Sequence, residues 1–167
     1  MADLRSKTCC FTGHRELPET EIPAIRERTA RCIRLLYNNG VRYFGVGGAI
    51  GYDTLAAQLL FRLRMEELKD IRVILVYPFE GFTDRWSPQQ KRLYARLLPY
   101  YDKKVCVAQS GSREAYLARD RHLVDASSYC IAYCVKESGG TAYTLQYAQR
   151  QGIKVFNVSI EAPPELR

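Results

Sequence analysis

Short apolar runs rich in β-branched and aromatic residues alternate along the chain with stretches whose apolar residues recur at helical spacing. The strand-like runs cover residues 7–11, 42–46, 71–77, 104–108, 129–135 and 153–158. Two of these runs, IRVILVY and YCIAYCV, are almost continuously apolar, a pattern typical of strands that are covered on both faces. The chain therefore predicts about six buried strands of the parallel type.

Between the strand-like runs, apolar residues recur every three or four positions. The first such stretch places Ile25, Ile33 and Leu36 on one stripe and ends at the sequence NNG, a usual helix stop. Ser87 followed by Pro88 is a favourable start for a helix. We expect helices over residues 21–38, 53–68, 88–98, 113–127 and 141–151.

Regular alternation of strands and helices predicts an α/β fold with a doubly wound, mostly parallel sheet of about six strands and helices on both faces. The chain has 167 residues, within the usual range for one domain. We find no internal repeat and no linker-like stretch, so we expect residues 1–167 to form a single domain.

Composition places the expected domain in the cytoplasm. No apolar run approaches the roughly 20 residues of a membrane span, and the first residues lack the apolar core of a signal peptide. Five of the six cysteines fall in strand-like runs and Cys32 falls on the apolar side of a helix, so we expect reduced core cysteines. With no C-x-x-C pair and only His14 and His122, no metal site is predicted.

The formal net charge of +7 suggests an anionic partner. The basic residues are nevertheless spread along the chain, and two groups of them fall on the polar sides of the first and third expected helices. These groups are Arg26, Arg31 and Arg34, and Lys91, Arg92 and Arg96. A solvated helix face explains such residues as well as nucleic-acid binding does.

Unusual residues follow several of the expected strands, at the carboxyl edge where open α/β sheets bind ligands. A glycine-rich turn that leads into a helix can hold an anion through free backbone N–H groups and the helix dipole. The residues in question are Gly13, His14 and Arg15 after the first strand, Gly47, Gly48, Gly51 and Asp53 after the second, and Ser138, Gly139, Gly140 and Thr141 after the fifth. Their clustering predicts a binding site in which Gly139, Gly140 and Thr141 hold a phosphate and Gly47, Gly48 and Gly51 form a second wall.

Each of these features also has a purely structural explanation. Glycines mark tight turns, and neither glycine-rich loop matches the Walker A pattern or G-x-G-x-x-G. His14 and Arg15 could hold a phosphate or cap a turn, and Arg119 could swing over the site or lie on the helix surface.

Three aromatic residues after the third strand are similarly ambiguous. Phe79, Phe82 and Trp86 could stack on a base or could roof the core.

The motifs FTGHR, GGAIGYDTLAA, PF…RW, Y…ARDRHLVDASS and GGTAYTLQYAQRQG occur in this order over nearly the whole chain. In this respect the chain resembles the small stand-alone proteins of the SLOG superfamily. The resemblance implies a Rossmann-like fold in a bacterial protein. It also implies kinship with Lonely Guy phosphoribohydrolases, with the DNA-processing protein A family that handles single-stranded DNA, and with sensor domains for ADP-ribose-type nucleotides.

Lonely Guy enzymes carry an arginine before the fifth strand and a P-G-G-x-G-T-x-x-E signature whose glutamate assists cleavage of the N-glycosidic bond. Arg119 falls at the position of that arginine, so it is the first candidate catalytic residue if the chain is an enzyme. Gln146, however, falls where the glutamate should be, and an amide cannot act as a general base. Glu137 or Asp53 would have to replace it.

The sequence therefore favours a nucleotide sensor or regulatory protein without strong catalysis, with ADP-ribose or a related ribonucleotide as ligand and no other cofactor. A phosphoribohydrolase or N-glycosidase acting on nucleotides is the first alternative, and a single-stranded nucleic-acid-binding protein is the second and less favoured one. The resemblance also implies a homodimer, because relatives of this fold often dimerise.

Overall fold

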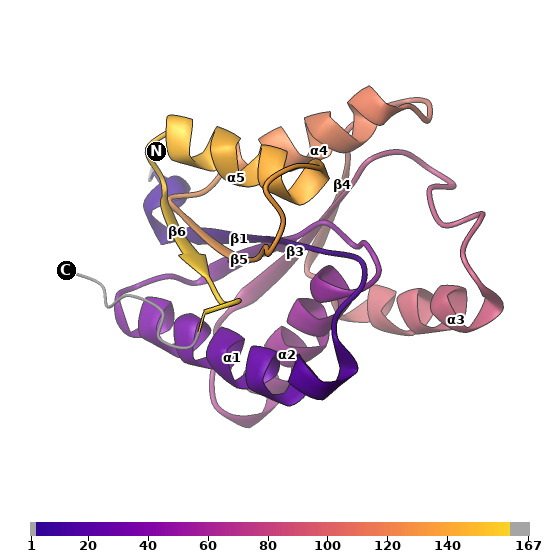
Figure 1. The fold of residues 1–167 in the computed structure, drawn as a ribbon. Coiled ribbons are helices and arrows are strands. Elements are labelled where there is room, and N and C mark those ends of the chain that lie inside the picture. The colour runs from indigo at the N-terminus through magenta and orange to yellow at the C-terminus, as the bar shows by residue number, and fades with distance from the viewer. Residues whose placement is uncertain (1–2, 161–167) are drawn as a thin grey trace.

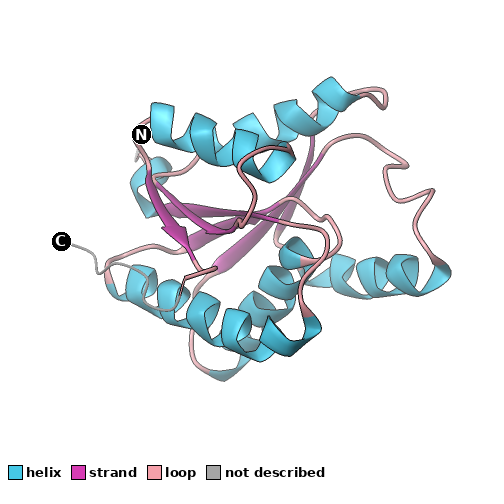
Figure 2. Cartoon of the chain, in the orientation of Figure 1, coloured by secondary structure: helices cyan, strands magenta, loops and turns pink. Residues whose placement is uncertain are grey.

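The computed structural model describes residues 3–160, in which six strands alternate with five α-helices (Figures 1 and 2). The strands are β1 (Thr8–Gly13), β2 (Tyr43–Val46), β3 (Arg72–Tyr77), β4 (Lys103–Cys106), β5 (Tyr129–Tyr133) and β6 (Lys154–Asn157). The helices are α1 (Ile22–Asn38), α2 (Tyr52–Glu66), α3 (Pro88–Leu97), α4 (Arg113–Asp125) and α5 (Gly140–Arg150). Every predicted element is present, so the periodicity of the sequence was sufficient to find them all.

All six strands are parallel and lie in the order β4-β3-β2-β1-β5-β6. The predicted α/β, Rossmann-like, doubly wound sheet is confirmed, and it is entirely rather than mostly parallel. The chain builds the sheet outward from β1 to β4 and then returns to place β5 on the other side of β1. The point where the direction of building reverses therefore lies between β1 and β5, where ligands of such folds usually bind.

The sheet separates two layers of helices (Figure 1). α1 and α2 cover one face, where the larger apolar core includes Phe11, Phe44 and Leu60, and α3 lies farther out on the same side. α4 and α5 cover the other face over a smaller core that includes Cys10 and Cys130, which pair directly across β1 and β5. Both faces are thus buried, as the continuous apolar runs predicted.

One end of β5 differs from the prediction. The sequence placed its end at residue 135, but the ladder stops at Tyr133. The next two backbone amides donate to side chains instead, Cys134 to Asn157 Oδ1 at 3.2 Å and Val135 to His14 Nε2 at 2.9 Å. These two bonds turn the chain away from the sheet, towards the glycine pair that starts α5.

The prediction that all cysteines lie in the core was wrong for Cys106. The other cysteines are buried, whereas Cys106 is exposed at the end of β4. β4 is an edge strand, and three of its four residues are exposed. A strand-like run does not reveal its place in the sheet, so the exposure of an edge strand cannot be predicted from the pattern alone.

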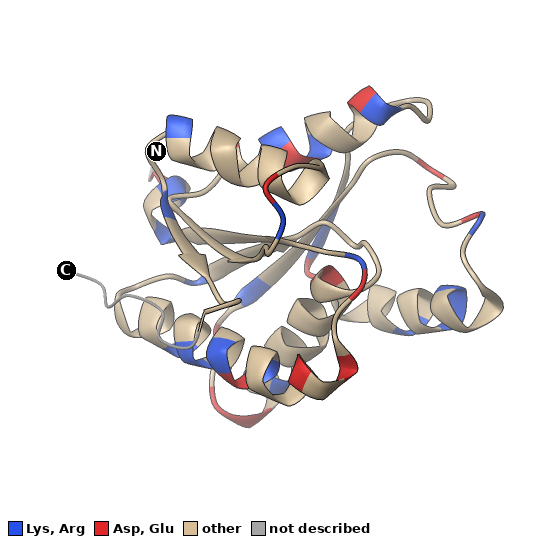
Figure 3. Ribbon diagram, viewed as in Figure 1, with Lys and Arg blue, Asp and Glu red and all other residues tan. Residues whose placement is uncertain are grey.

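Lys and Arg occur on both helical layers rather than on one (Figure 3). Several are paired with carboxylates, including Arg34 with Glu67 at 2.6 Å and Arg64 with Asp102 at 2.7 Å.

Within residues 3–160, no helix combines the length and apolar character that a membrane span needs.

The loop from β2 to α2 packs tightly against the loop that follows β1. Tyr52 donates its backbone N–H to the His14 carbonyl at 3.0 Å. Gly51 has a φ of 82°, and a Cβ at this position would lie 2.3 Å from the Arg15 carbonyl oxygen. The backbone conformation and the close approach of a second backbone both require glycine here.

We expect Gly51→Ala to lower the free energy of unfolding by about 2 kcal/mol more than Gly152→Ala, as measured by urea denaturation. Gly152 is the matched control because its φ of 76° is similar, while its Cβ would meet no atom within 4 Å. Equal losses in the two variants would contradict the close packing of the two loops.

Candidate functional site

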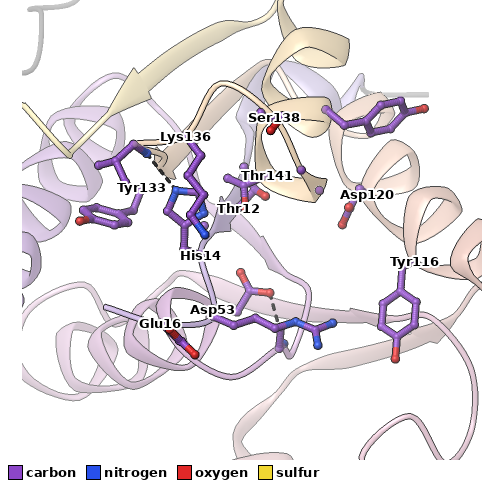
Figure 4. A pocket seen from close by; sticks show the side chains of 18 of the residues that line it. Thr12, His14, Glu16, Asp53, Tyr116, Asp120, Tyr133, Lys136, Ser138 and Thr141 are labelled. Carbon is purple, nitrogen blue, oxygen red and sulfur yellow. Dashed lines mark hydrogen bonds between the residues drawn. The ribbon is translucent and has the colours of Figure 1, made fainter. Parts of the chain in front are cut away.

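A cleft of about 1110 Å³ lies at the carboxyl ends of β1 and β5, at the reversal point of the sheet. Its walls come from the end of β1 and the loop that follows it (residues 11–16), from the end of β5 through the start of α5 (residues 133–143), and from α2 and α4. Figure 4 shows His14 and Lys136 on one side, Asp120 and Tyr116 on the other, and Thr12 and Thr141 between them. Segments far apart in the sequence thus meet around one hollow.

Most of the residues that the sequence singled out line this cleft. They are Gly13, His14, Arg15, Asp53, Arg119, Ser138, Gly139, Gly140 and Thr141. Gly47, Gly48 and Gly51 do not belong to the lining, and the β2–α2 loop reaches the cleft through Ala49 and Asp53 instead. Both glycine-rich loops therefore reach the cleft, the β5–α5 loop through its glycines and the β2–α2 loop through Ala49 and Asp53.

Gly47 and Gly48 lie beneath the cleft, where their lack of a side chain leaves space for neighbouring side chains. A Cβ at Gly47 would lie 2.8 Å from Arg119 Nη1 and 2.9 Å from Asp53 Oδ2. A Cβ at Gly48 would lie 2.7 Å from Leu75 in the core. These glycines, like Gly51, allow close packing, so in this structure the second loop supports the site rather than forming a second wall of free amides.

The loop before α5 has the geometry of an anion site. α5 begins at Gly140, and Gly139 precedes it with a φ of 102° and no side chain that caps the helix. Both glycines are exposed, and a Cβ on either would meet nothing within 4 Å. The first-turn amides and the positive end of the helix dipole therefore face open space beside the cleft.

His14 fixes the loop that leads to this helix. Its Nε2 accepts the hydrogen bond from Val135 N–H, so this nitrogen must be unprotonated, and its ring packs edge-on against Tyr133 at 5.7 Å. Burial lowers the pKa of His14, and the charge of Lys136 lowers it further. Both effects favour the neutral imidazole, which joins the loop after β1 to the loop after β5.

Asp53 lies in the first turn of α2 and is only 6% exposed. Its Oδ2 accepts the backbone N–H of Ala49 at 3.2 Å, whereas its buried Oδ1 has no hydrogen-bond partner among residues 3–160. Burial raises the pKa of this carboxyl to about 6, and the positive charge of Arg119 opposes that rise. The cleft therefore contains a buried acceptor that lacks a donor.

Arg119 is held in place, contrary to the expectation of an arginine free to swing over the site. It is 6% exposed, its Nη1 donates to the Gly47 carbonyl, and its Nε donates to Asp120 Oδ1 at 2.7 Å. Asp120 also accepts from Thr144 Oγ1 at 3.0 Å, which links α4 to α5. The guanidinium thus forms part of the floor of the cleft.

Some lining residues were missed by the sequence analysis: Arg113, Tyr116, Asp120 and Lys136. Tyr116 and Asp120 could have been found, because they stand four residues apart on α4, with Arg119 between them, on the same side of the helix. Arg113 is exposed at the first residue of α4, and Lys136 is exposed in the loop before α5, so helical spacing does not show that either side chain faces the cleft.

The charged lining residues are balanced in sign. Four are cationic, Arg15, Arg113, Arg119 and Lys136, and four are acidic, Glu16, Asp53, Asp120 and Glu137. Such a lining suits a ligand that carries both negative charge and hydrogen-bond donors. Within the described residues, no group of three or more His, Cys, Asp or Glu side chains could hold a metal ion.

The aromatic residues after β3 lie outside this lining. Phe82 is buried and makes edge-to-face contacts with Trp86 and Tyr94, each at 5.4 Å between ring centroids. Phe79 lies between Phe82 and Tyr116. The structure agrees with the interpretation that these rings roof the core near α3.

Two solved structures share this fold at low sequence identity. The DNA processing protein A of Streptococcus pneumoniae superposes with a TM-score of 0.64 at 18% identity, over 92% of this chain and 50% of that chain. The protein of the same name from Helicobacter pylori, which binds single-stranded DNA, gives a TM-score of 0.63 at 18% identity and is covered over 65% of its length. The present chain thus spans about half to two thirds of these proteins, and the likeness shows the fold alone.

Sequence relatives are bacterial proteins of comparable length. A UPF0398 protein of Bacillus velezensis is 20% identical over 136 residues, which are 77% of this chain and 74% of the relative. A UPF0398 protein of Staphylococcus epidermidis is 21% identical over 134 residues, 75% of this chain and 71% of the relative. The sequence model of the YspA SLOG family matches residues 9–160, and SLOG proteins generally bind nucleotides. The chain belongs to the YspA SLOG family.

Proposed function

We propose that this protein binds ADP-ribose or a related ribonucleotide in the cleft and acts as a sensor or regulatory protein. The observation that carries the proposal is the joint presence of an uncapped helix N-terminus and a buried carboxylate oxygen that lacks a donor. The first suits a phosphate, which is an acceptor. The second suits a hydroxyl, which is a donor, and a ribonucleotide presents both groups a few ångströms apart.

The phosphate lies, in this proposal, against Gly139, Gly140 and Thr141. The amides of the first turn of α5 donate to it, and the Thr141 hydroxyl adds a further donor. Lys136 and Arg15, both exposed at the rim, supply positive charge. Because the glycines carry no side chain over the helix end, the phosphate can approach the backbone closely.

The sugar lies above Asp53. A buried unpartnered acceptor costs about 1–3 kcal/mol, a penalty that a ribose hydroxyl would remove by donating to Oδ1. The rise in the Asp53 pKa to about 6 means that the charged carboxylate is less stable here than in water. A residue that destabilises the empty protein in this way is best explained by an interaction with the ligand.

Gln146 supports a binding rather than a catalytic role. It lines the cleft from α5 at the position where Lonely Guy enzymes carry their glutamate, and its amide has no carboxylate chemistry. Lys and Arg occur on both helical layers (Figure 3), so the positive charge is not gathered on one face as a nucleic-acid-binding groove would favour. Assembly into a homodimer stays a prediction from the resemblance.

Purified protein should gain thermal stability with ADP-ribose or AMP. At a ligand concentration a hundred times the Kd, the gain is about 2.7 kcal/mol, or roughly 5–10 °C in Tm by differential scanning fluorimetry. Gly140→Asp should abolish the gain, because a carboxylate at the first turn occupies the anion position. The same variant should fold normally, because acidic residues favour a helix N-terminus.

Gly140→Ala is the matched control for this experiment. Its methyl group enters open space, and Gly140 does not have a positive φ, so both fold and binding should be retained. The proposal is refuted if a broad panel of nucleotides leaves the Tm of the wild-type protein unchanged.

Asp53→Asn should stabilise the empty protein at pH 7 and weaken nucleotide binding. A rise in pKa from 3.8 to about 6 corresponds to about 3 kcal/mol of destabilisation once the carboxyl is ionised. The pKa of Asp53 is higher in the folded than in the unfolded protein. The ionisation penalty of this carboxyl is therefore absent below about pH 4 and develops as the pH rises through 6. The free energy of unfolding of the variant should therefore rise relative to that of the wild type between pH 4 and pH 7, as measured by urea denaturation.

The exposed Asp84→Asn variant is the control for the loss of a carboxylate at the surface, and it is measured over the same pH range. If Asp53→Asn gave a difference independent of pH, the buried carboxylate would not have the raised pKa on which the argument rests.

A second function is favoured by one observation. Asp53 and Asp120 both line the cleft, and Asp53 can hold a proton up to about pH 6. A pair of carboxyl groups, one protonated and one ionised, can assist hydrolysis of a glycosidic bond. In that reaction water adds to the anomeric carbon, the bond to the base breaks, and the base leaves with a proton.

If the protein is a hydrolase, adenine is released from AMP or nicotinamide from NAD, as measured by chromatography. Asp120→Asn should then reduce the rate by at least about 100-fold, in line with the loss of a group that assists proton transfer or charge stabilisation. Arg119→Ala is a poorer probe than the sequence suggested, because Arg119 is buried and binds the Gly47 carbonyl. If no free base appeared after prolonged incubation, the hydrolase function would be excluded and the sensor function would remain.

A further inference from the structure

One aromatic side chain on the wall of the cleft is not accounted for by the phosphate and sugar positions. Tyr116 lies in the second turn of α4 and lines the cleft opposite His14 (Figure 4). It is partly exposed, and its hydroxyl makes no hydrogen bond to another described residue. A large ring that is neither buried in the core nor bonded through its hydroxyl is available to a ligand.

The ring is supported from behind by other aromatic residues. Phe79 contacts Tyr116 edge-to-face, with 5.5 Å between centroids and 89° between planes, and Phe82 contacts Phe79 in the same manner at 6.5 Å. Phe79 itself is held by Gly111, where a Cβ would come within 2.8 Å of the Phe79 ring. Tyr116 is therefore attached to a packed row of rings, so little conformational freedom remains to be lost on binding.

Two guanidinium groups lie beside the ring. The Arg15 Cζ is 5.5 Å from the centroid of Tyr116, and the Arg119 Cζ is 5.8 Å from it. Arg119 is buried and fixed, whereas Arg15 is exposed and can move. A planar heterocycle can enter between the Tyr116 ring and the Arg15 guanidinium if Arg15 moves outward, because bases stack on both aromatic rings and guanidinium planes.

The position of Tyr116 fits the order of groups in a nucleotide. Asp120 lies one turn beyond Tyr116 on α4. Thr144 Oγ1 on α5 lies 3.0 Å from Asp120 Oδ2 and 2.9 Å from the Gly140 carbonyl oxygen, so its one hydrogen is shared between these two acceptors. The aromatic wall and the glycine pair are thus joined by a short chain of contacts along one side of the cleft. A ligand with its phosphate at Gly140 and its sugar near Asp53 can direct its base to Tyr116.

We propose that Tyr116 is the base-stacking residue of the site, and that the protein selects nucleotides over sugar phosphates through this ring and Arg15. This inference rests on the proposed nucleotide function and adds to it the recognition of the base. Stacking of a base on an aromatic side chain accounts for about 5- to 150-fold in affinity.

The test compares two probes, AMP and ribose 5-phosphate, by isothermal titration calorimetry on the wild type and on Tyr116→Ala and Tyr116→Phe. The wild type should bind AMP at least about 10-fold more tightly than ribose 5-phosphate. Tyr116→Ala should weaken AMP by a similar factor and leave ribose 5-phosphate unchanged. Tyr116→Phe should retain AMP binding, because the ring and not the hydroxyl makes the contact.

The outcomes separate this inference from the function on which it rests. Equal affinities of the wild type for AMP and ribose 5-phosphate would overturn the role of Tyr116 while leaving phosphate and sugar recognition intact. An equal loss of both probes in Tyr116→Ala would assign the ring a structural role and would also overturn it. Failure of the wild type to bind either probe would overturn this inference, and the proposed function would fall with it only if the broad nucleotide panel also left the Tm unchanged.

Discussion

The buried guanidinium of Arg119 is the contact on which the candidate site depends. It joins the β2–α2 loop, through the Gly47 carbonyl, to α4, through Asp120, and so connects the two helical layers at the end of the sheet. A charge this deeply buried persists only when its donors are used, and the glycine at position 47 is what allows the guanidinium to reach its acceptor. The floor of the cleft is therefore fixed before any ligand arrives.

The rim differs from the floor. Residues 135–140 are exposed, and a pair of glycines there precedes α5, so this segment can adjust to a ligand more readily than the floor. The His14 ring accepts a hydrogen bond from the Val135 amide at the start of this segment, and the Cys134 thiol donates to the Lys136 carbonyl at 3.3 Å. In the proposed function, the fixed floor makes the contact to the sugar, and the exposed rim contributes the amides that hold the phosphate.

The sequence predicted the elements well because both faces of the sheet are buried, which gives the strands continuous apolar runs. It also predicted that residues following β1 and β5 would meet, because all parallel strands end on one edge. It did not reveal that Gly47 and Gly48 lie under the site, nor that Arg119 is immobile. Both depend on close packing between segments distant in the sequence, which no local pattern encodes: a Cβ at Gly47 would lie 2.8 Å from Arg119 Nη1, and a Cβ at Gly48 would lie 2.7 Å from Leu75. Tyr116, by contrast, stands three residues before Arg119 on one helix face and could have been recognised.

The combination of charges in the cleft restricts what can bind there. A free phosphate would satisfy the N-terminus of α5 but would leave the Asp53 oxygen without a donor. A neutral sugar would satisfy Asp53 but would leave the helix N-terminus and Lys136 without an anion. Only a ligand that presents an anion and hydroxyl donors together removes both penalties. In the proposed function, the free amides at Gly140 and the unpartnered oxygen of Asp53, rather than the net charge of +7, therefore select a ligand that carries both an anion and hydroxyl groups.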